Sequence, residues 1–315
     1  MKPDLFEQDL LDIPARLNQL ADRLDVDDPW APLASHGALL TGMGSSQYAA
    51  RTAAGWLRHR GASVTDEIAT TDPGWPGGPG TSAILISASG GSAETLDRAS
   101  RLAEGTQRVA LVNTMDSALA RRSDALITMH AGPEPGEVAC RTYRHTIALL
   151  LALAFPRSDI ATACRAAAQH TSALLADTSW LDAIDEILTP TQTTYWIAPE
   201  NRIGSALQSA LMMREVPRRP AVGCETGDWS HVDVYLTLTT EYRCVVFTGS
   251  SWDSQAVDWL TKRGSHVVSI GDALGVPGEF NVAMPGNPFA RMLCETLIAE
   301  LLALRWWRRD PIEAA

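Results

Sequence analysis

Apolar runs of strand length alternate with helix-length stretches along most of the chain. In the first half, five such runs are separated by polar or Gly/Ser-rich residues, which is the pattern of buried strands. The predicted strands are 38–40, 63–66, 83–87, 108–112 and 125–128, and the predicted helices are 47–58, 93–103, 117–121 and 142–154. This alternation predicts an α/β domain built on a parallel sheet.

The flanking segments indicate how the rest of the chain is organised. Residues 4–24 have apolar positions at helical spacing with Pro14 as a kink, and the Ala-rich residues 157–188 read as helical without strand signals. A second alternation follows, with strands at 194–198, 243–248, 266–270 and 280–283 and helices at 204–215, 254–263 and 288–307. We therefore predict a degenerate duplication: two similar, mostly parallel-sheet α/β domains flanked by helices. The predicted boundaries are a helical segment at 1–30, a first domain at 31–157, a connector at 158–188 and a second domain at 189–315.

Two Gly/Ser-rich loops follow predicted strands and precede predicted helices. They read Gly42-Met-Gly-Ser-Ser-Gln47 and Ser87-Ala-Ser-Gly-Gly-Ser92. Such loops aim backbone N–H groups and hydroxyls at the positive end of a helix dipole, where a phosphate group binds. The Lys of a P-loop and the G-x-G-x-x-G of a dinucleotide fold are missing, so we expect the phosphate of a small molecule. Either loop alone fits a plain turn with a helix cap, but their recurrence about 45 residues apart favours a phosphate site.

Composition and charge narrow the function classes. The 315 residues carry a formal net charge of −11 and no basic stripe, which argues against nucleic-acid binding. No apolar run reaches 18 residues, so no membrane span is expected, and the acidic, amphipathic start does not read as a signal peptide. Five scattered cysteines without a C-x-x-C pair predict a reducing, cytoplasmic location. The seven histidines show no metal-ligand spacing, so neither a metal nor another cofactor is expected.

Several motifs together resemble the SIS (sugar isomerase) family, and within it the isomerase half of glucosamine-6-phosphate synthase and related amino-sugar-phosphate isomerases and deaminases. Gly44-Ser-Ser46 resembles the family's G-T-S loop, and Ser87-Ala-Ser-Gly-Gly-Ser92 its S-Q-S-G-E-T loop. Further matches are Asn113 with Ser117–Asp124, Ala131–Glu134 with Val138-Ala139, the helix Ala206–Val216, and Gly227–His231. Six matches in family order imply that both predicted domains are of SIS type.

The resemblance also implies the roles of particular residues. Phosphate would be bound by four serine side chains and two glycine backbones, namely Ser46, Ser87, Ser89, Ser92, Gly90 and Gly91. Other substrate contacts would fall at Gly44, Ser45, Glu134, Val138 and Ala139. Glu215 would be the general base that moves a proton between C1 and C2 of the open-chain sugar. His231, supplied by a neighbouring subunit, would help open the ring, which implies a homodimer with shared sites. The alternatives are a solvated helix-end Glu215 and a structural His231 beside Trp229.

The chain departs from the family pattern at several positions. Ala88 and Gly91 replace a Gln and a Glu, and Thr142 takes the usual place of a Lys. The lysine-bearing tail and the glutaminase domain of the synthase have no counterpart in the sequence, which favours the deaminases and other stand-alone relatives. We therefore expect a phosphosugar isomerase acting on a hexose or amino-hexose 6-phosphate, with or without deamination. The alternative is a catalytically weak sugar-phosphate sensor.

Overall fold

The computed structural model describes residues 2–31, 33 and 37–310, and these form two compact units. The N-terminal unit comprises Ala15–Glu134 and Ala139–Arg165. The C-terminal unit comprises Met1–Pro14, Pro135–Val138 and Ala166–Ala315. The first helix thus belongs to the same unit as the last one, and the boundaries predicted at residues 30, 157 and 188 stay a prediction.

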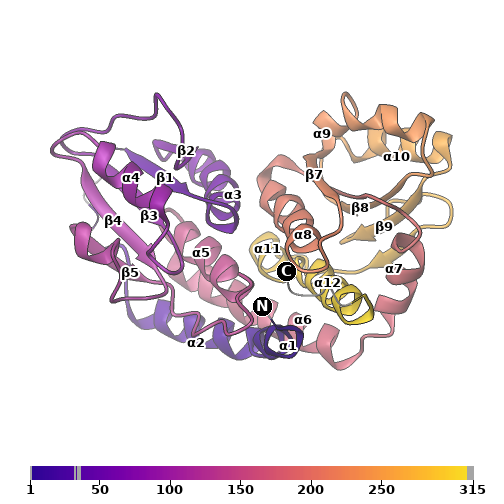
Figure 1. Ribbon diagram of the computed structural model, residues 1–315, viewed down its shortest axis with the longest axis horizontal. Helices are drawn as coiled ribbons and strands as arrows, with labels where there is room; N and C mark the ends of the chain where they lie inside the picture. Colours follow the sequence, from indigo (N-terminus) through magenta and orange to yellow (C-terminus); the bar gives the residue numbers. More distant parts are fainter. Residues whose placement is uncertain (1, 32, 34–36, 311–315) are drawn as a thin grey trace. The chain divides into compact units, whose positions relative to one another are not determined.

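The N-terminal unit is built on a five-stranded parallel sheet with the order β2-β1-β3-β4-β5 (Figure 1). The strands are β1 (Ala38–Gly42), β2 (Val64–Ile68), β3 (Ser82–Ile86), β4 (Gln107–Val112) and β5 (Ala125–Thr128). Its helices are α2 (Ile13–Val26), α3 (Ser45–His59), α4 (Ala93–Arg101), α5 (Arg141–Leu151) and the start of α6 (Arg157–Ala176). Every residue of β1 and β3 is buried, as expected for parallel strands covered on both faces.

Helix α5 of the N-terminal unit is fully buried in the chain. All eleven of its residues are buried, including Arg141, Arg144 and His145, and α5 packs against α3 (Figure 1). The other wall of the sheet is a cluster in which Leu39, Leu85 and Ala110 contact apolar residues of α4 and of the segment after β4. The carboxyl ends of β1 and β3 therefore stand between two packed layers, which holds their loops in place.

The C-terminal unit has a second five-stranded parallel sheet, in the order β10-β9-β8-β6-β7. The strands are β6 (Thr194–Ala198), β7 (Ala221–Glu225), β8 (Arg243–Phe247), β9 (His266–Ile270) and β10 (Phe280–Val282). Its helices are α1 (Pro3–Leu11), the rest of α6, α7 (Trp180–Leu188), α8 (Ile203–Glu215), α9 (Thr226–Trp229), α10 (Asp253–Arg263), α11 (Pro288–Cys294) and α12 (Leu297–Arg309). Numbered from its own first strand, this sheet has the strand order 2-1-3-4-5, as the first sheet does.

The predicted α/β class with two parallel sheets is confirmed, with differences in detail. Strand β7 was missed because Ala221–Glu225 shows no apolar alternation, being an edge strand with Gly223 at its centre. The helix predicted at 117–121 is only a 3₁₀ turn, Ala120–Arg122. The helix predicted at 288–307 is divided into α11 and α12. Within the described residues, no helix has both the length and the apolar character needed to span a membrane.

Candidate functional site

The two Gly/Ser loops leave neighbouring strands at the carboxyl edge of the N-terminal sheet. Gly42, the last residue of β1, is in register with Ile86, the last residue of β3. The chain goes from β1 outward to β2 and then returns to the other side of β1, so β1 and β3 flank the point where the strand order reverses. Ligands of open parallel sheets bind in the crevice at this point. The predicted phosphate loops therefore meet where a ligand site is expected.

The first loop brings Ser46 close to the sheet edge because Gly42 has no side chain. A Cβ at position 42 would lie 2.7 Å from Ser46 Cβ and 2.8 Å from Ile86 O. Gly44 precedes α3 with φ +50° and supplies no side-chain cap. The first turn of this fifteen-residue helix is therefore open to an anion, with Ser45 and Ser46 within it.

The second loop is fixed by backbone contacts to the next strand. Ser87 N donates to Leu111 O (3.1 Å), and Asn113 N donates to Ala88 O (2.9 Å). Gly90 adopts φ +63°, and a Cβ there would lie 2.1 Å from Ser117 Oγ and 2.5 Å from Ser117 Cβ. Both the backbone conformation and the space at this position require glycine.

Some serine hydroxyls of the two loops form hydrogen bonds within the protein, and others do not. Ser92 caps α4, since its Oγ accepts from Thr95 N (3.3 Å) and donates to Glu94 Oε2 (2.9 Å). Ser89 Oγ accepts from Gly91 N (3.2 Å). Within the described chain, the side chains of Ser46 and Ser87 make no hydrogen bond. These two hydroxyls therefore have their full hydrogen-bonding capacity for a ligand.

Glu134 has a structural role that the sequence did not reveal. One of its carboxylate oxygens accepts from Cys140 N (2.9 Å) and Arg141 N (2.6 Å), and the other accepts from Thr142 Oγ1 (2.7 Å). The carboxylate thus caps the first turn of α5, with the favourable charge for a helix N-terminus. A substrate contact of Glu134 stays a prediction. Val138 is buried and Ala139 half-buried, and their substrate contacts likewise stay predictions.

The loop before Glu134 is attached to the end of β4 by one side chain. Asn113 Nδ2 donates to Gly132 O (2.7 Å), and Asn113 Oδ1 accepts from Ala131 N (3.0 Å). Asn113 appeared in the sequence only as part of a motif. Its position directly after an apolar strand was the signal that its amide would pair with a neighbouring loop. Four successive strand ends, those of β1, β3, β4 and β5, are therefore linked into one edge.

Glu215 and His231 both lie in the C-terminal unit. Glu215 is the last residue of α8 and is half-buried, and this burial raises the pKa of its carboxyl group above the usual range. His231 follows α9, and its side chain is exposed. A carboxyl group with a raised pKa has the property of a general base that works near neutral pH. The catalytic roles of both residues stay predictions.

The corresponding crevice of the C-terminal sheet has a different chemistry. At the ends of β6 and β8, Arg202 forms a buried ion pair with Glu295 (Nη1–Oε2 2.5 Å) and also donates to Thr248 O. The cavity of about 400 Å³ beside it is lined by three carboxylates, Asp253, Asp258 and Asp272. Carboxylates repel a phosphate dianion, and Arg291, 3.7 Å from Asp272, offsets only part of their charge. A phosphate group is therefore better suited to the serine-lined crevice of the N-terminal sheet than to this one.

Comparison with known proteins shows what this domain is similar to. The family model of the SIS domain matches residues 34–156, which include all five strands of the N-terminal sheet. Among solved structures, the chain is similar to tagatose-6-phosphate ketose/aldose isomerase from Escherichia coli, with a TM-score of 0.84 and 18% identity over 98% of this chain and 93% of that one. A putative phosphosugar isomerase from Silicibacter pomeroyi gives a TM-score of 0.83 at 16% identity, covering 98% and 99% of the two chains. At these identities the likeness shows a shared fold.

The curated relatives are isomerizing glutamine–fructose-6-phosphate aminotransferases. The protein from Zymomonas mobilis is 25% identical over 301 residues, which cover 88% of this chain and 49% of the relative. The protein from Thermotoga maritima is 42% identical over 79 residues, covering 24% and 13% of the two chains. The chain therefore spans about half the length of the first of these relatives.

Proposed function

We propose that this protein is a phosphosugar isomerase that interconverts the aldose and ketose forms of a hexose or amino-hexose 6-phosphate. The observation that carries the proposal is the pair of Gly/Ser loops at the reversal point of the N-terminal sheet. Ser46 and Ser87 offer free hydroxyls there, and Ser89 and Ser92 add further hydroxyl groups, whereas the N–H of Gly90 is used within the loop to bond Ser87 O. Hydroxyls and amides give a phosphomonoester dianion several directed donors without adding a cation.

The phosphate would position the sugar, and Glu215 would carry out the proton transfer. In the open-chain aldose the carboxylate removes the proton from C2, and the electrons form the C1–C2 double bond of an enediol as the C1 carbonyl oxygen takes up a proton. The same group then returns its proton to C1 as the C2 hydroxyl loses its proton and becomes a carbonyl. Burial of Glu215 supports this role, because a raised pKa makes the carboxylate a stronger base. With an amino sugar, hydrolysis of the C2 imine formed after the shift would release ammonia.

We also propose that His231 acts across a homodimer. Next to it lie large apolar side chains that are unusually exposed, with Val232 at 57%, Tyr235 at 66% and Leu238 at 56%. An apolar surface of this kind marks an interaction site, and a second copy of the chain covering it would bring His231 to the partner. The five cysteines are free thiols, which supports a reducing, cytoplasmic location.

A second candidate function is a sugar-phosphate sensor with little turnover. The specific observation in its favour is the site around Glu134. Its carboxylate is engaged with the α5 backbone and with Thr142, the residue in the family's Lys position. No cation stands at that position to stabilise developing charge.

The test is turnover by the purified full chain on a panel of phosphosugars, with binding measured by calorimetry on the same samples. The panel contains glucosamine 6-phosphate, galactosamine 6-phosphate, fructosamine 6-phosphate, and fructose 6-phosphate with and without ammonia. Glu215→Gln should bind the active substrate within about threefold of wild type but lose roughly 10²–10⁴ in kcat. The exposed Glu241→Gln is the matched control. Binding without turnover of any member by wild type would support the sensor, and Glu215→Gln with full activity would refute the proton-transfer role.

A further inference from the structure

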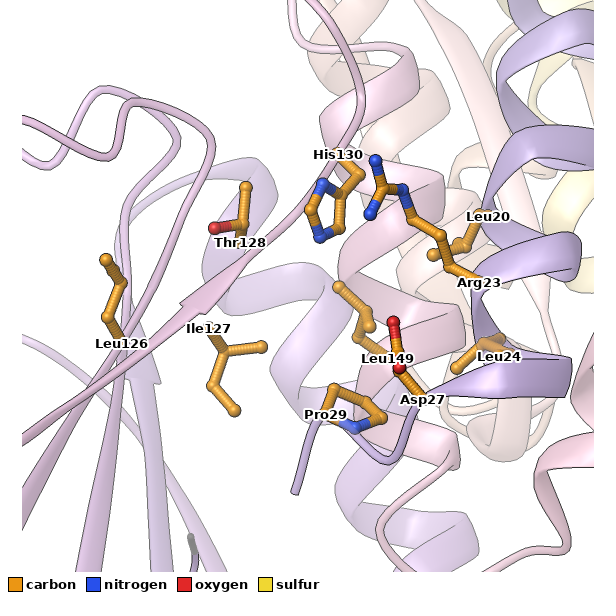
Figure 2. A pocket seen from close by; sticks show the side chains of 10 residues that line it. All are labelled: Leu20, Arg23, Leu24, Asp27, Pro29, Leu126, Ile127, Thr128, His130 and Leu149. Carbon is orange, nitrogen blue, oxygen red and sulfur yellow. The ribbon is translucent and has the colours of Figure 1, made fainter. Parts of the chain in front are cut away.

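A cavity of about 200 Å³ lies at the open edge of the N-terminal sheet, between β5 and α2 (Figure 2). Strands β3 and β4 separate this edge from the end of β1, so the cavity is distinct from the serine-lined crevice. Its apolar part is formed by buried side chains from α2, β5 and α5, namely Leu20, Leu24, Ile127 and Leu149. Trp30, whose Nε1 donates to Leu149 O (2.7 Å), fixes the chain where it leaves α2.

Charged and polar groups line the same cavity. Arg23 and Asp27 lie one helical turn apart on α2 and line the cavity beside His130 and Thr128 (Figure 2). Neither Arg23 nor Asp27 forms an ion pair with any residue that the structure describes. The cavity thus presents one cation and one anion that have no ion-pair partner among the described residues.

His130 is held in an unfavourable backbone conformation at the mouth of this cavity. Its φ is +57°, in the left-handed region that side chains of L-residues seldom occupy. Strain of this kind persists where the surroundings impose it and is concentrated at ligand sites. Burial, aided by the charge of Arg23, lowers the pKa of the imidazole, so His130 is neutral near pH 7 and offers one donor and one acceptor.

We propose that this cavity binds a small aliphatic α-amino or α-hydroxy acid. The carboxylate would pair with the guanidinium of Arg23 in the planar geometry that arginine favours. The ammonium or hydroxyl on the next carbon would donate to Asp27, and the alkyl chain would lie on the leucine and isoleucine side chains. The local charges of Arg23 and Asp27 cancel, which matches a ligand of low net charge and disfavours a phosphate dianion. The volume is below the roughly 300–1,000 Å³ of pockets for drug-sized ligands, which restricts the ligand to a small metabolite.

The experiment is calorimetry of the full chain with four probes that share an isobutyl group. They are L-leucine, L-2-hydroxy-4-methylpentanoate, 4-methylpentanoate without the α-donor, and 3-methylbutylamine without the carboxylate. We expect leucine or the hydroxy acid to bind at least tenfold more tightly than 4-methylpentanoate and 3-methylbutylamine. Whether leucine or the hydroxy acid binds more tightly shows whether an ammonium or a hydroxyl group donates to Asp27. Failure of both to bind, or equal binding of 4-methylpentanoate, overturns the proposal.

Two variants locate the binding in the cavity. Arg23→Gln should weaken binding of the preferred acid at least tenfold, and Asp27→Asn should remove its advantage over 4-methylpentanoate. The control is Arg122→Gln, which removes the same charge as Arg23→Gln from an exposed position on another segment. It should bind the preferred acid as wild type does. Unchanged binding by Arg23→Gln refutes the assignment. Since Arg23 and Asp27 are exposed, thermal unfolding should show the same midpoint for all variants, and phosphosugar turnover should not change.

Discussion

Replacing Gly90 by Ala tests the architecture of the second phosphate loop most directly. The new methyl group would lie 2.5 Å from Ser117 Cβ, far inside contact distance, in a backbone with φ +63°. The left-handed conformation costs an L-residue about 1–2 kcal/mol, and forcing a methyl group into a packed site costs about 1–3 kcal/mol more. The variant should therefore lose about 2–5 kcal/mol of unfolding free energy or shift the loop to avoid the clash.

The loop shift is the functional part of this prediction. Gly90 N donates to Ser87 O (3.0 Å), and Leu119 N donates to Gly90 O (2.9 Å), so movement of Gly90 displaces Ser87 and the turn that follows. Chemical denaturation of the variant measures the stability, and calorimetry with the phosphosugar that wild type binds measures the site. We expect affinity to fall at least tenfold, since each hydrogen bond to a charged group contributes about 1.5–3 kcal/mol.

Two further variants separate the effect of the steric clash at Gly90→Ala from the effect of its backbone strain. Gly91→Ala is the matched control, because a Cβ at position 91 would meet only Ser89 Oγ at 3.6 Å, an ordinary contact. Its free energy of unfolding should be close to that of wild type. In the double variant Gly90→Ala with Ser117→Gly, the clash is removed and the backbone strain of about 1–2 kcal/mol remains. Wild-type stability and affinity of Gly90→Ala alone would refute the packing argument.

The remaining predictions concern charge and pH. If Glu215 is the base, kcat should rise with pH through an apparent pKa above 4.5, since burial raises its pKa and activity needs the ionised form; a profile that is flat above pH 4 contradicts this. Glu94→Gln should tighten phosphate binding about twofold to fivefold at low ionic strength, an effect that should vanish near 1 M salt, where the Debye length is about 3 Å. Burial lowers the pKa of His145 to about 4 from its usual 6.5. As pH drops from 6.5 toward 4, the imidazole is protonated in the unfolded chain but not yet in the folded protein, so the free energy of unfolding falls. Between pH 7 and 4.5 this loss should be roughly 2–3 kcal/mol, and urea titrations of His145→Gln should lack it.

The fold was predictable from sequence where a short stretch of residues carries a clear hydrophobic pattern. Strands such as Ala38–Gly42 and Ser82–Ile86 are short apolar runs that end at Gly or Ser, and both the strand and the following loop follow from that pattern. Edge strand Ala221–Glu225 was missed because half-burial and a central glycine remove the pattern. The final helix was predicted as one piece because its apolar spacing continues across the break between Cys294 and Leu297.

The candidate site was predictable in its loops and not in its long-range pairs. Ser46 and Ser87 are recognisable because their neighbours along the chain make the turn. Glu134 caps α5 because its loop folds back to bring the carboxylate to Cys140 and Thr142. The residue type at position 134 does not predict this contact. The pair Arg202 and Glu295 joins residues far apart in the sequence, so only the packed sheet and helices bring them together.

The pairing of α1 with α12 has a consequence for synthesis of the chain. Arg308 of α12 forms ion pairs with Asp4 (2.8 Å) and Glu7 (2.9 Å) of α1, and α1 packs against α12. A ribosome makes α1 first and α12 much later, with the whole N-terminal unit produced in between. The apolar face of α1, with Phe6 and Leu10, therefore stays without its partner while the N-terminal unit can already fold. Nascent chains stalled before Leu297 should expose this face to chaperones, and released full-length chains should not.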